Sequence, residues 1–370
     1  MNSFPIPQPP NWQLDWQSIH DRFEFVRSMQ GCNQEPSYHA EGDVWIHTRM
    51  VCESLASNQH WRMLPEEERR IVFIASLMHD VAKPVCTRLE DGRLTSRGHS
   101  SRGEIIARVL LWQMETPMRV REQIASLIRW HQVPFFLIES NNSLRRLIEV
   151  SQTARCDLLA LVTESDGRGR ICEGQQRLLD NISLFEQFAA EEQCLRQPRQ
   201  FPSDHSRFLY FRKEDRNPNY SAYDDTTCEV ILMSGLPGAG KDHWIATQAP
   251  DWPVISLDAL RREMKIAPTD KQGAVIARAK ETAREYLRRK QSFIWNATNF
   301  SRQMRELSLS LCAAYKARVR IVYVETSESR LLEQNREREH SVPPAVIERM
   351  LAKWQVPDLT EAHQVQWVES

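Results

Sequence analysis

The spacing of apolar residues divides the chain into two parts. From about residue 16 to 195, apolar side chains recur every three or four positions, and glycine and proline are sparse. This periodicity predicts helices and no strands, so we expect residues 16–196 to form an all-α domain. The clearest helical segments are 43–57, 66–82, 101–114, 119–131, 143–164 and 171–193.

From residue 228 onward the pattern changes to short, continuous apolar runs rich in β-branched residues. Such runs are typical of buried parallel strands, and helical stretches separate them. We therefore expect residues 228–370 to form an α/β doubly wound domain. The predicted strands are 228–235, 252–258, 292–298 and 320–326.

Two segments lack either pattern. Residues 1–15 are rich in proline and glutamine, and we expect a poorly ordered leader. Residues 197–227 are rich in turn-forming types and predict a linker. The linker either packs on one domain or offers an aromatic and basic strip to a nucleic-acid strand. The residues of that strip are Arg207, Phe208, Tyr210, Phe211, Arg212 and Lys213.

Composition narrows the classes of function. The chain has 370 residues, which suggests two domains, and a formal net charge of -1. Any nucleic-acid site must therefore be a local basic patch. The eight cysteines form no CxxC pair, which favours reduced thiols. No run of 18 apolar residues and no signal-peptide pattern occur, so we expect a cytoplasmic protein without a membrane span.

The segment GLPGAGKD (235–242) follows the first predicted strand and precedes a helix, the context that the phosphate-binding P-loop requires. Gly235, Gly238 and Gly240 let backbone N–H groups curl around phosphate oxygens at the helix N-terminus. Lys241 supplies the positive charge for the β- and γ-phosphates. The segment predicts a site for ATP or another nucleoside triphosphate.

Asp242 departs from this motif, which usually has Ser or Thr to supply a hydroxyl to Mg²⁺. A carboxylate is also a good ligand for Mg²⁺, but it adds negative charge beside the phosphates. The sequence therefore leaves undecided which groups hold Mg²⁺ at this site.

Further candidates follow the other predicted strands. Asp258 could accept the proton of an acceptor hydroxyl, with Arg261 three residues later as a nearby cation. Alternatively, Asp258 caps the following helix. Polar side chains after the third strand, among them Asn296 and Arg305, could face substrate or Mg²⁺.

Arginines in the last long helical stretch, Arg336 and Arg338, could close over the γ-phosphate. Residues 228–370 resemble the phage-type polynucleotide 5′-kinase family. The resemblance is carried by GLPGAGK, the Asp258/Arg261 pair and the run NRERE…VPPAVIERM. The resemblance implies that Asp258 is a general base, that Arg261 binds the acceptor phosphate, and that Arg336 or Arg338 is a lid arginine.

The helical part carries histidines and aspartates in the order H…HD…H…H…D. Imidazole and carboxylate groups together suit transition metals, and a bound metal lowers the pKa of its water for attack on a phosphoester. This order resembles the HD phosphohydrolase superfamily. The resemblance implies Lys83 as the basic residue after the HD pair, and these metal ligands: His47, His79, Asp80, His99, His131 and Asp166.

The last of these ligands is open, because Asp157 lies nine residues before Asp166 on the same predicted helix. We prefer Asp166, because Gly-Arg follows it as in several HD families.

The combined architecture resembles the bacterial HD-Pnk RNA end-healing enzymes. That resemblance implies removal of a 2′,3′-cyclic phosphate or 2′-phosphate with Ni²⁺, Co²⁺ or Mn²⁺, and phosphorylation of a 5′-OH with ATP and Mg²⁺. RNA or DNA ends would be the substrates, and an RNA ligase would seal the products. Alternatives are a small-molecule kinase, an HD domain acting on free nucleotides, and a metal-free HD module that positions RNA.

Overall fold

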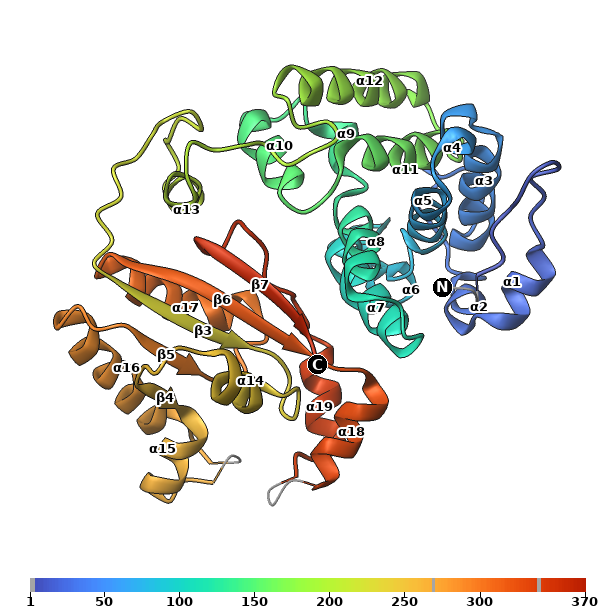
Figure 1. Cartoon of the computed structure of the whole chain (residues 1–370). Coiled ribbons are helices and arrows are strands. Elements are labelled where there is room, and N and C mark those ends of the chain that lie inside the picture. Colours follow the sequence, from blue (N-terminus) through green and yellow to red (C-terminus); the bar gives the residue numbers. More distant parts are fainter. Residues whose placement is uncertain (1–3, 268–269, 338–340) are drawn as a thin grey trace. The chain divides into compact units, whose positions relative to one another are not determined.

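The computed structural model describes residues 4–267, 270–337 and 341–370, which divide into two compact units, Met1–Gln200 and Phe201–Ser370. The first unit is helical and the second is built on a sheet (Figure 1). Among the described residues, none of the helices has both the length and the apolar character needed to cross a membrane.

The first unit follows the helical pattern expected from the sequence. Asp43 caps the helix that carries His47, since its carboxylate accepts from the backbone N–H of Ile46 at 2.8 Å. The helices are α1 (Trp16–Arg22), α2 (Glu24–Met29), α3 (Val44–Ser57), α4 (Gln59–Met63), α5 (Glu66–Met78), α6 (Lys83–Cys86), α7 (His99–Gln113), α8 (Met118–Trp130), α9 (Val133–Phe136), α10 (Ser143–Ser151), α11 (Cys156–Arg168) and α12 (Gln175–Glu191).

One hydrophobic cluster forms the core of this unit, and α3, α5, α8 and α11 supply much of it. Helix α5 is buried almost throughout its second half, from Ile71 to Met78. This helix therefore ends inside the core, where the next two residues are His79 and Asp80.

The expectation of a disordered leader is wrong for the described residues 4–15. Phe4 and Ile6 are buried in the core cluster, and the Phe4 ring stacks on Phe23 with 4.6 Å between centroids. Burial of the apolar side chains between the prolines contributes more favourable free energy than ordering this short segment costs in chain entropy.

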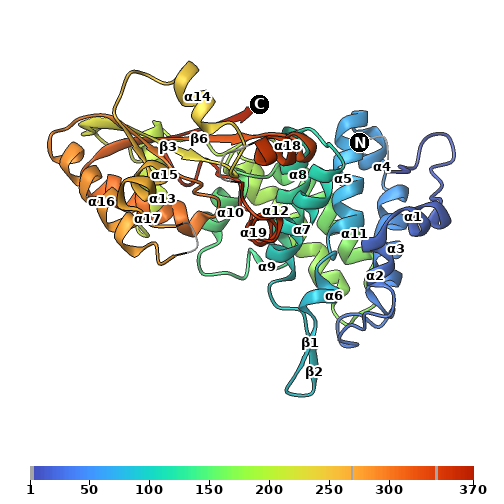
Figure 2. The ribbon, with the colours of Figure 1, turned by 90° about the horizontal axis from the view of Figure 1, so that it is seen from below.

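The expectation of no strands in the first unit is also wrong. Strands β1 (Arg88–Glu90) and β2 (Arg93–Thr95) form an antiparallel hairpin that projects from the helices of this unit (Figure 2). Its turn is Asp91-Gly92, and both residues have positive φ, 50° and 77°, as a two-residue hairpin turn requires. The strands escape the periodicity analysis because they are short and largely exposed.

The second unit has a five-stranded parallel sheet in the order β4-β5-β3-β6-β7, which confirms the α/β doubly wound prediction. The edge strand β7 was not among the predicted strands. The strands are β3 (Cys228–Ser234), β4 (Val254–Ser256), β5 (Phe293–Asn296), β6 (Ala317–Glu325) and β7 (Gln364–Glu369).

Both faces of this sheet are covered. Val230 and Leu232 of β3 belong to one apolar cluster, to which α16 and α17 contribute, whereas Ile231 and Met233 face a second cluster that contains Trp244. The helices are α13 (Asp204–Arg212), α14 (Lys241–Gln248), α15 (Leu257–Met264), α16 (Gly273–Arg288), α17 (Arg302–Ala314), α18 (Glu328–Glu337) and α19 (Pro344–Leu351).

The segment predicted as a linker contains helix α13, which packs within the second unit. Phe208 and Tyr210 are buried, and Arg207 donates to the backbone oxygens of Leu359 and His363. Of the two interpretations, the structure therefore favours packing on one domain, because most of the strip is occupied by contacts inside the unit.

Candidate metal centre and candidate phosphate-binding loop

The HD pair lies at the junction between α5 and α6. His79 is the C-cap residue that follows α5, Asp80 comes next, and Lys83 begins α6. The other expected ligands lie on or next to four helices: His47 lies on α3, His99 begins α7, His131 is the C-cap residue that follows α8, and Asp166 lies on α11. All six are buried, with exposed fractions of 0–5%.

These side chains form two groups that share Asp80. In the first, His47 Nε2 lies 3.1 Å from Asp166 Oδ1 and 3.3 Å from His79 Nε2, and His79 Nε2 lies 3.2 Å from Asp80 Oδ2. In the second, His99 Nε2 lies 3.3 Å from Asp80 Oδ1 and 3.4 Å from His131 Nε2. Asp80 therefore turns one oxygen toward each group.

The backbone determines which ring nitrogen of three histidines carries the proton. Nδ1 of His79 donates to Ser76 O at 2.7 Å, that of His99 to Ser96 O at 2.8 Å, and that of His131 to Ile128 O at 2.8 Å. In each neutral ring, Nε2 then has no proton and carries a lone pair. These lone pairs converge on Asp80, which is the orientation that metal-ligating histidines adopt.

Two features show that this set fits a cation. The Nε2 atoms of His99 and His131 are both acceptors, so their 3.4 Å approach is repulsive without a positive charge between them. Asp80 Oδ1 is buried and makes no hydrogen bond to any described residue. A divalent metal would satisfy these atoms, and mixed imidazole and carboxylate ligands suit transition metals.

Electrostatics keep the carboxylates of Asp80 and Asp166 ionised and the imidazoles of His99 and His131 neutral. Burial alone would raise the pKa of Asp80, but the charges of His79 and Lys83 lower that pKa well below its usual value. Burial lowers the pKa of His131 to about 3, so its imidazole is available as a ligand at neutral pH.

Lys83 is buried beside the cluster. Its Nζ lies 2.7 Å from Asp80 Oδ2 and donates to Gln34 Oε1 at 2.6 Å. The ammonium group therefore compensates part of the negative charge of Asp80 and lies where a phosphate oxygen bound at the cluster would be within reach of a cation.

Asp157 and Asp166 occupy different environments. Asp166 accepts two hydrogen bonds from Arg170, both at 2.8 Å, and contacts His47. Asp157 instead pairs with Arg155 at the start of α11. The placement favours Asp166 as the last ligand.

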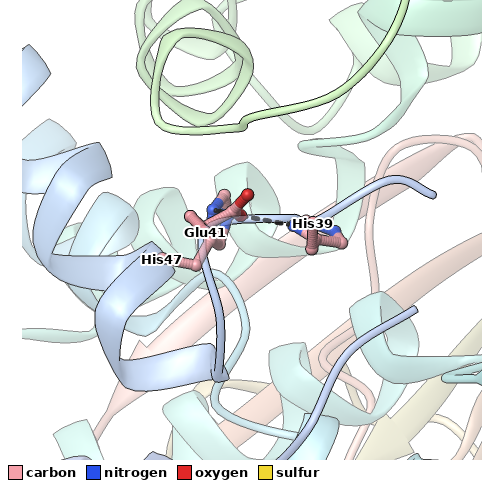
Figure 3. Close-up of side chains that lie close together, drawn as sticks. All are labelled: His39, Glu41 and His47. Carbon is pink, nitrogen blue, oxygen red and sulfur yellow. Dashed lines mark hydrogen bonds and ion pairs between the residues drawn. The ribbon is translucent and has the colours of Figure 1, made fainter. Parts of the chain in front are cut away.

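Sequence reasoning missed Glu41, which lies just before the helix of His47. Its buried side chain accepts from His47 Nδ1 and His39 Nδ1, each at 2.8 Å, and from the backbone N–H of Ile171 at 2.8 Å. Figure 3 shows this carboxylate with the two imidazoles. Burial would raise the pKa of Glu41, but the bonds from His39 and His47 lower it below the usual value. The spacing His-x-Glu ahead of the capped helix was the available signal.

The P-loop joins β3 to α14, as its motif predicted. Gly235, Gly238 and Gly240 have positive φ of 144°, 84° and 93°. A Cβ on Gly235 would lie 2.2 Å from the backbone oxygen of Val324, so only glycine fits there. Lys241 Nζ donates to the backbone oxygens of Gly235 at 3.1 Å and Leu236 at 2.8 Å, which holds the ammonium group over the loop.

The neighbouring candidates surround the carboxyl end of the sheet. Asp242 accepts from Asn296 Nδ2 at 2.6 Å, which joins the unusual carboxylate to the end of β5. Asp258 pairs with Arg261, and Arg261 also donates to Gln272 at 2.7 Å. The helix α15 is capped by Ser256, whose side chain accepts from Ala259 N, so the cap does not depend on Asp258.

The predicted arginines have different positions. Arg336 is exposed near the end of α18, and Arg338 lies outside the described residues. Arg305 cannot face substrate as expected, because it is fully buried and makes two hydrogen bonds to Glu361 at 2.7 and 2.8 Å.

Each unit matches a protein family over part of its length. Residues 43–161 match the family described as HD domain, and residues 230–357 match the family described as AAA domain. A crystal structure of a protein assigned as a kinase from Chloroflexus aurantiacus covers 39% of this chain and 86% of its own, with 21% identity and a TM-score of 0.33.

One curated relative shares part of the chain. Over 104 residues the chain is 36% identical to the CC-adding tRNA nucleotidyltransferase of Thermus thermophilus. The match covers 28% of this chain and 23% of that protein, so the chain spans about a quarter of the length of this relative. The chain thus joins a helical HD domain to a P-loop kinase-like α/β domain.

Proposed function

We propose that the chain is a bifunctional enzyme that heals broken RNA ends. Its HD domain removes a 2′,3′-cyclic phosphate or a 2′-phosphate, and its kinase-like domain phosphorylates a 5′-OH with a nucleoside triphosphate. The observation that carries the proposal is the presence, in one chain, of a closed His/Asp cluster suited to a metal and a P-loop with its lysine in place. The two chemistries together act on both ends of one break.

In the HD domain, the ligands proposed to hold the metal are the six clustered side chains. A divalent metal bound there would supply Lewis acidity and lower the pKa of a water ligand. Asp80 and Asp166 hold negative charge at fixed positions, and His99 and His131 offer neutral nitrogens. Lys83, 2.7 Å from Asp80, is placed to neutralise charge that develops on a phosphate oxygen.

In the kinase-like domain, the glycines of the P-loop offer backbone N–H groups to phosphate oxygens and Lys241 supplies a cation. Asp258 is the proposed base for the 5′-OH, and Arg261 the proposed contact for the adjacent phosphate of the acceptor. Asp242 and Asn296, joined at 2.6 Å, are the oxygen donors proposed for Mg²⁺. Arg336, with Arg338 nearby in sequence, is proposed to close over the γ-phosphate.

The choice of RNA as substrate has one further support. The relative matched over 104 residues is a CC-adding tRNA nucleotidyltransferase, so the substrate in its name is an RNA. Free nucleotides for the HD domain and a small-molecule acceptor for the kinase are the alternatives, and both are outcomes of the test below.

The test uses short RNA oligonucleotides and the full chain. One RNA carries a 5′-OH and is incubated with labelled ATP and Mg²⁺, and the other carries a 2′,3′-cyclic phosphate and is incubated with Ni²⁺, Co²⁺ or Mn²⁺. We expect both ends to be modified. Lys241→Ala should abolish labelling of the 5′ end only, and His79→Ala should abolish hydrolysis of the cyclic phosphate only.

Matched controls are Lys353→Ala and His60→Ala, which remove exposed side chains of the same types in the same two units. Modification of neither end would refute the RNA-end proposal and direct the search to small acceptors. Equal loss of both activities in either variant, with the fold retained, would refute two independent sites.

A further inference from the structure

A cavity of about 460 Å³ lies in the second unit, away from the P-loop. It is lined by α13, by residues 216–226 and by the junction of α17 and β6. Thr226 and Ala317 lie at the amino ends of β3 and β6, whereas the P-loop follows the carboxyl end of β3. Since β3 has seven residues, about 20 Å of sheet separates the cavity from the P-loop.

Stacked rings line one side of this cavity. Phe208 stacks on His363 with 4.0 Å between centroids, and His363 stacks on His205 with 5.3 Å between centroids. All three side chains are buried. These packed rings therefore back one side of the cavity.

A chain of hydrogen bonds determines the tautomer of His205. The backbone N–H of Val319 donates to His363 Nδ1 at 3.0 Å, so the proton of the neutral His363 ring is on Nε2. That Nε2–H donates to His205 Nδ1 at 3.1 Å. Burial lowers the pKa of His363 to about 3, which keeps this ring neutral. The Nε2 atom of His205 is therefore an N–H donor.

This donor lacks an acceptor. Among the described residues, His205 Nε2 has no hydrogen-bond partner, although the residue is 4% exposed. The carboxylate of Asp225 lies 3.8 Å away and is held by Lys316 at 2.6 Å. A buried N–H without an acceptor is destabilising, and a ligand with an acceptor oxygen or nitrogen would relieve that cost.

The outer wall adds flat aromatic rings and positive charge. Tyr223 is 86% exposed and Tyr220 is 56% exposed, and the guanidinium of Arg216 lies 5.5 Å from the centroid of the Tyr220 ring. Lys213 and Arg212 line the same cavity, and Arg212 pairs with Glu306. Exposed tyrosines beside cations are the surfaces on which nucleobases stack while phosphates are held by charge.

We propose that this cavity binds a nucleotide unit at a site separate from the P-loop. The base stacks on Tyr220 or Tyr223, an acceptor atom of the ligand accepts from His205 Nε2, and the phosphate faces Lys213 and Arg216. The ligand is either a free nucleotide or one unit of a nucleic-acid strand, since both present the same chemistry.

The test measures binding to the full chain with the P-loop saturated by a non-hydrolysable ATP analogue and Mg²⁺. The probes are AMP and a 5′-phosphorylated hexamer of riboadenylate, and calorimetry measures their affinities. The double variant Arg216→Ala/Tyr223→Ala should weaken binding at least about tenfold, as loss of one stacked ring does elsewhere. Arg278→Ala, which removes an exposed cation of α16, is the matched control and should bind as the wild type does.

A second pair of variants tests the buried donor. His205→Phe removes the N–H, whereas His205→Gln retains an amide donor of similar reach, so binding should be weaker in the first than in the second. Binding of AMP and hexamer alike supports a site for free nucleotides, and binding of the hexamer alone supports a strand site. Absence of binding by both probes, or equal affinity of wild type and double variant, would overturn the proposal whatever reaction the P-loop catalyses.

Discussion

In the HD domain, Asp80 is 1% exposed and lies within 3.3 Å of two imidazoles and a lysine, whereas in the kinase-like domain the side chain of Asp258 is 64% exposed. The first site is therefore assembled by folding, since its ligands come from five helices that pack around one core. The second has one rigid part, the P-loop, and other candidate groups near it, most of which lie on the surface. The activity of a buried site is expected to fall steeply when any one of its side chains is removed. The activity of an exposed site is expected to fall less.

The largest effect is expected for Asp80→Asn. Asp80 faces both histidine groups, so this change should weaken metal binding in both and lower phosphoesterase activity by more than about 100-fold, beyond what loss of an outer residue costs. Bound metal measured by mass spectrometry and hydrolysis of the cyclic phosphate would check this. The kinase activity of the same preparation is the control for folding, and full metal content would contradict a shared ligand.

An intermediate effect is expected for Glu41→Gln. The carboxylate holds His47 through Nδ1 at 2.8 Å, so the amide should lower metal affinity by about 10- to 100-fold. Affinity is measured by competition with a chelator, which requires no substrate. Glu67→Gln, an exposed glutamate of α5, should leave the affinity unchanged. The same affinity in Glu41→Gln and wild type would show that Glu41 does not orient the ligand.

The smallest effect is expected for Asp242→Asn. Removing one carboxylate beside the P-loop should raise the Mg²⁺ concentration for half-maximal kinase activity by only a few-fold, because water can replace one exposed ligand. This change corresponds to about 1 kcal/mol of binding free energy. The measurement is a Mg²⁺ titration of 5′ phosphorylation, with the exposed Asp251→Asn as control. A loss above about 100-fold would show that this site is as interdependent as the HD cluster.

The fold class could be predicted well because each domain has its own periodicity. Apolar spacing of three to four residues predicted the helices, and short β-branched runs predicted four of the five sheet strands. The β1–β2 hairpin escaped detection because three-residue, exposed strands leave no alternation to recognise. The prediction for the leader was wrong because prolines mask the buried Phe4 and Ile6.

The last metal ligand shows the limit of sequence spacing. Asp157 and Asp166 are nine residues apart on α11, which places them about 13 Å apart along the axis and on opposite sides of the helix. Spacing alone cannot say which side faces His47. Packing of α11 against α3 decides it, and Arg170 then pairs with Asp166 while Arg155 pairs with Asp157.

The sequence by itself determined the features that depend on neighbours in the chain. The P-loop is one continuous turn, and the HD pair is two adjacent residues at the end of one helix, so local order specifies both. Tertiary structure decided what depends on residues far apart in the sequence: the convergence of His47, Asp80 and Asp166, the support from Glu41, and the burial of Arg305. The reason is physical, because the position of a side chain between helices depends on how the helices pack, and many local sequences are compatible with each packing.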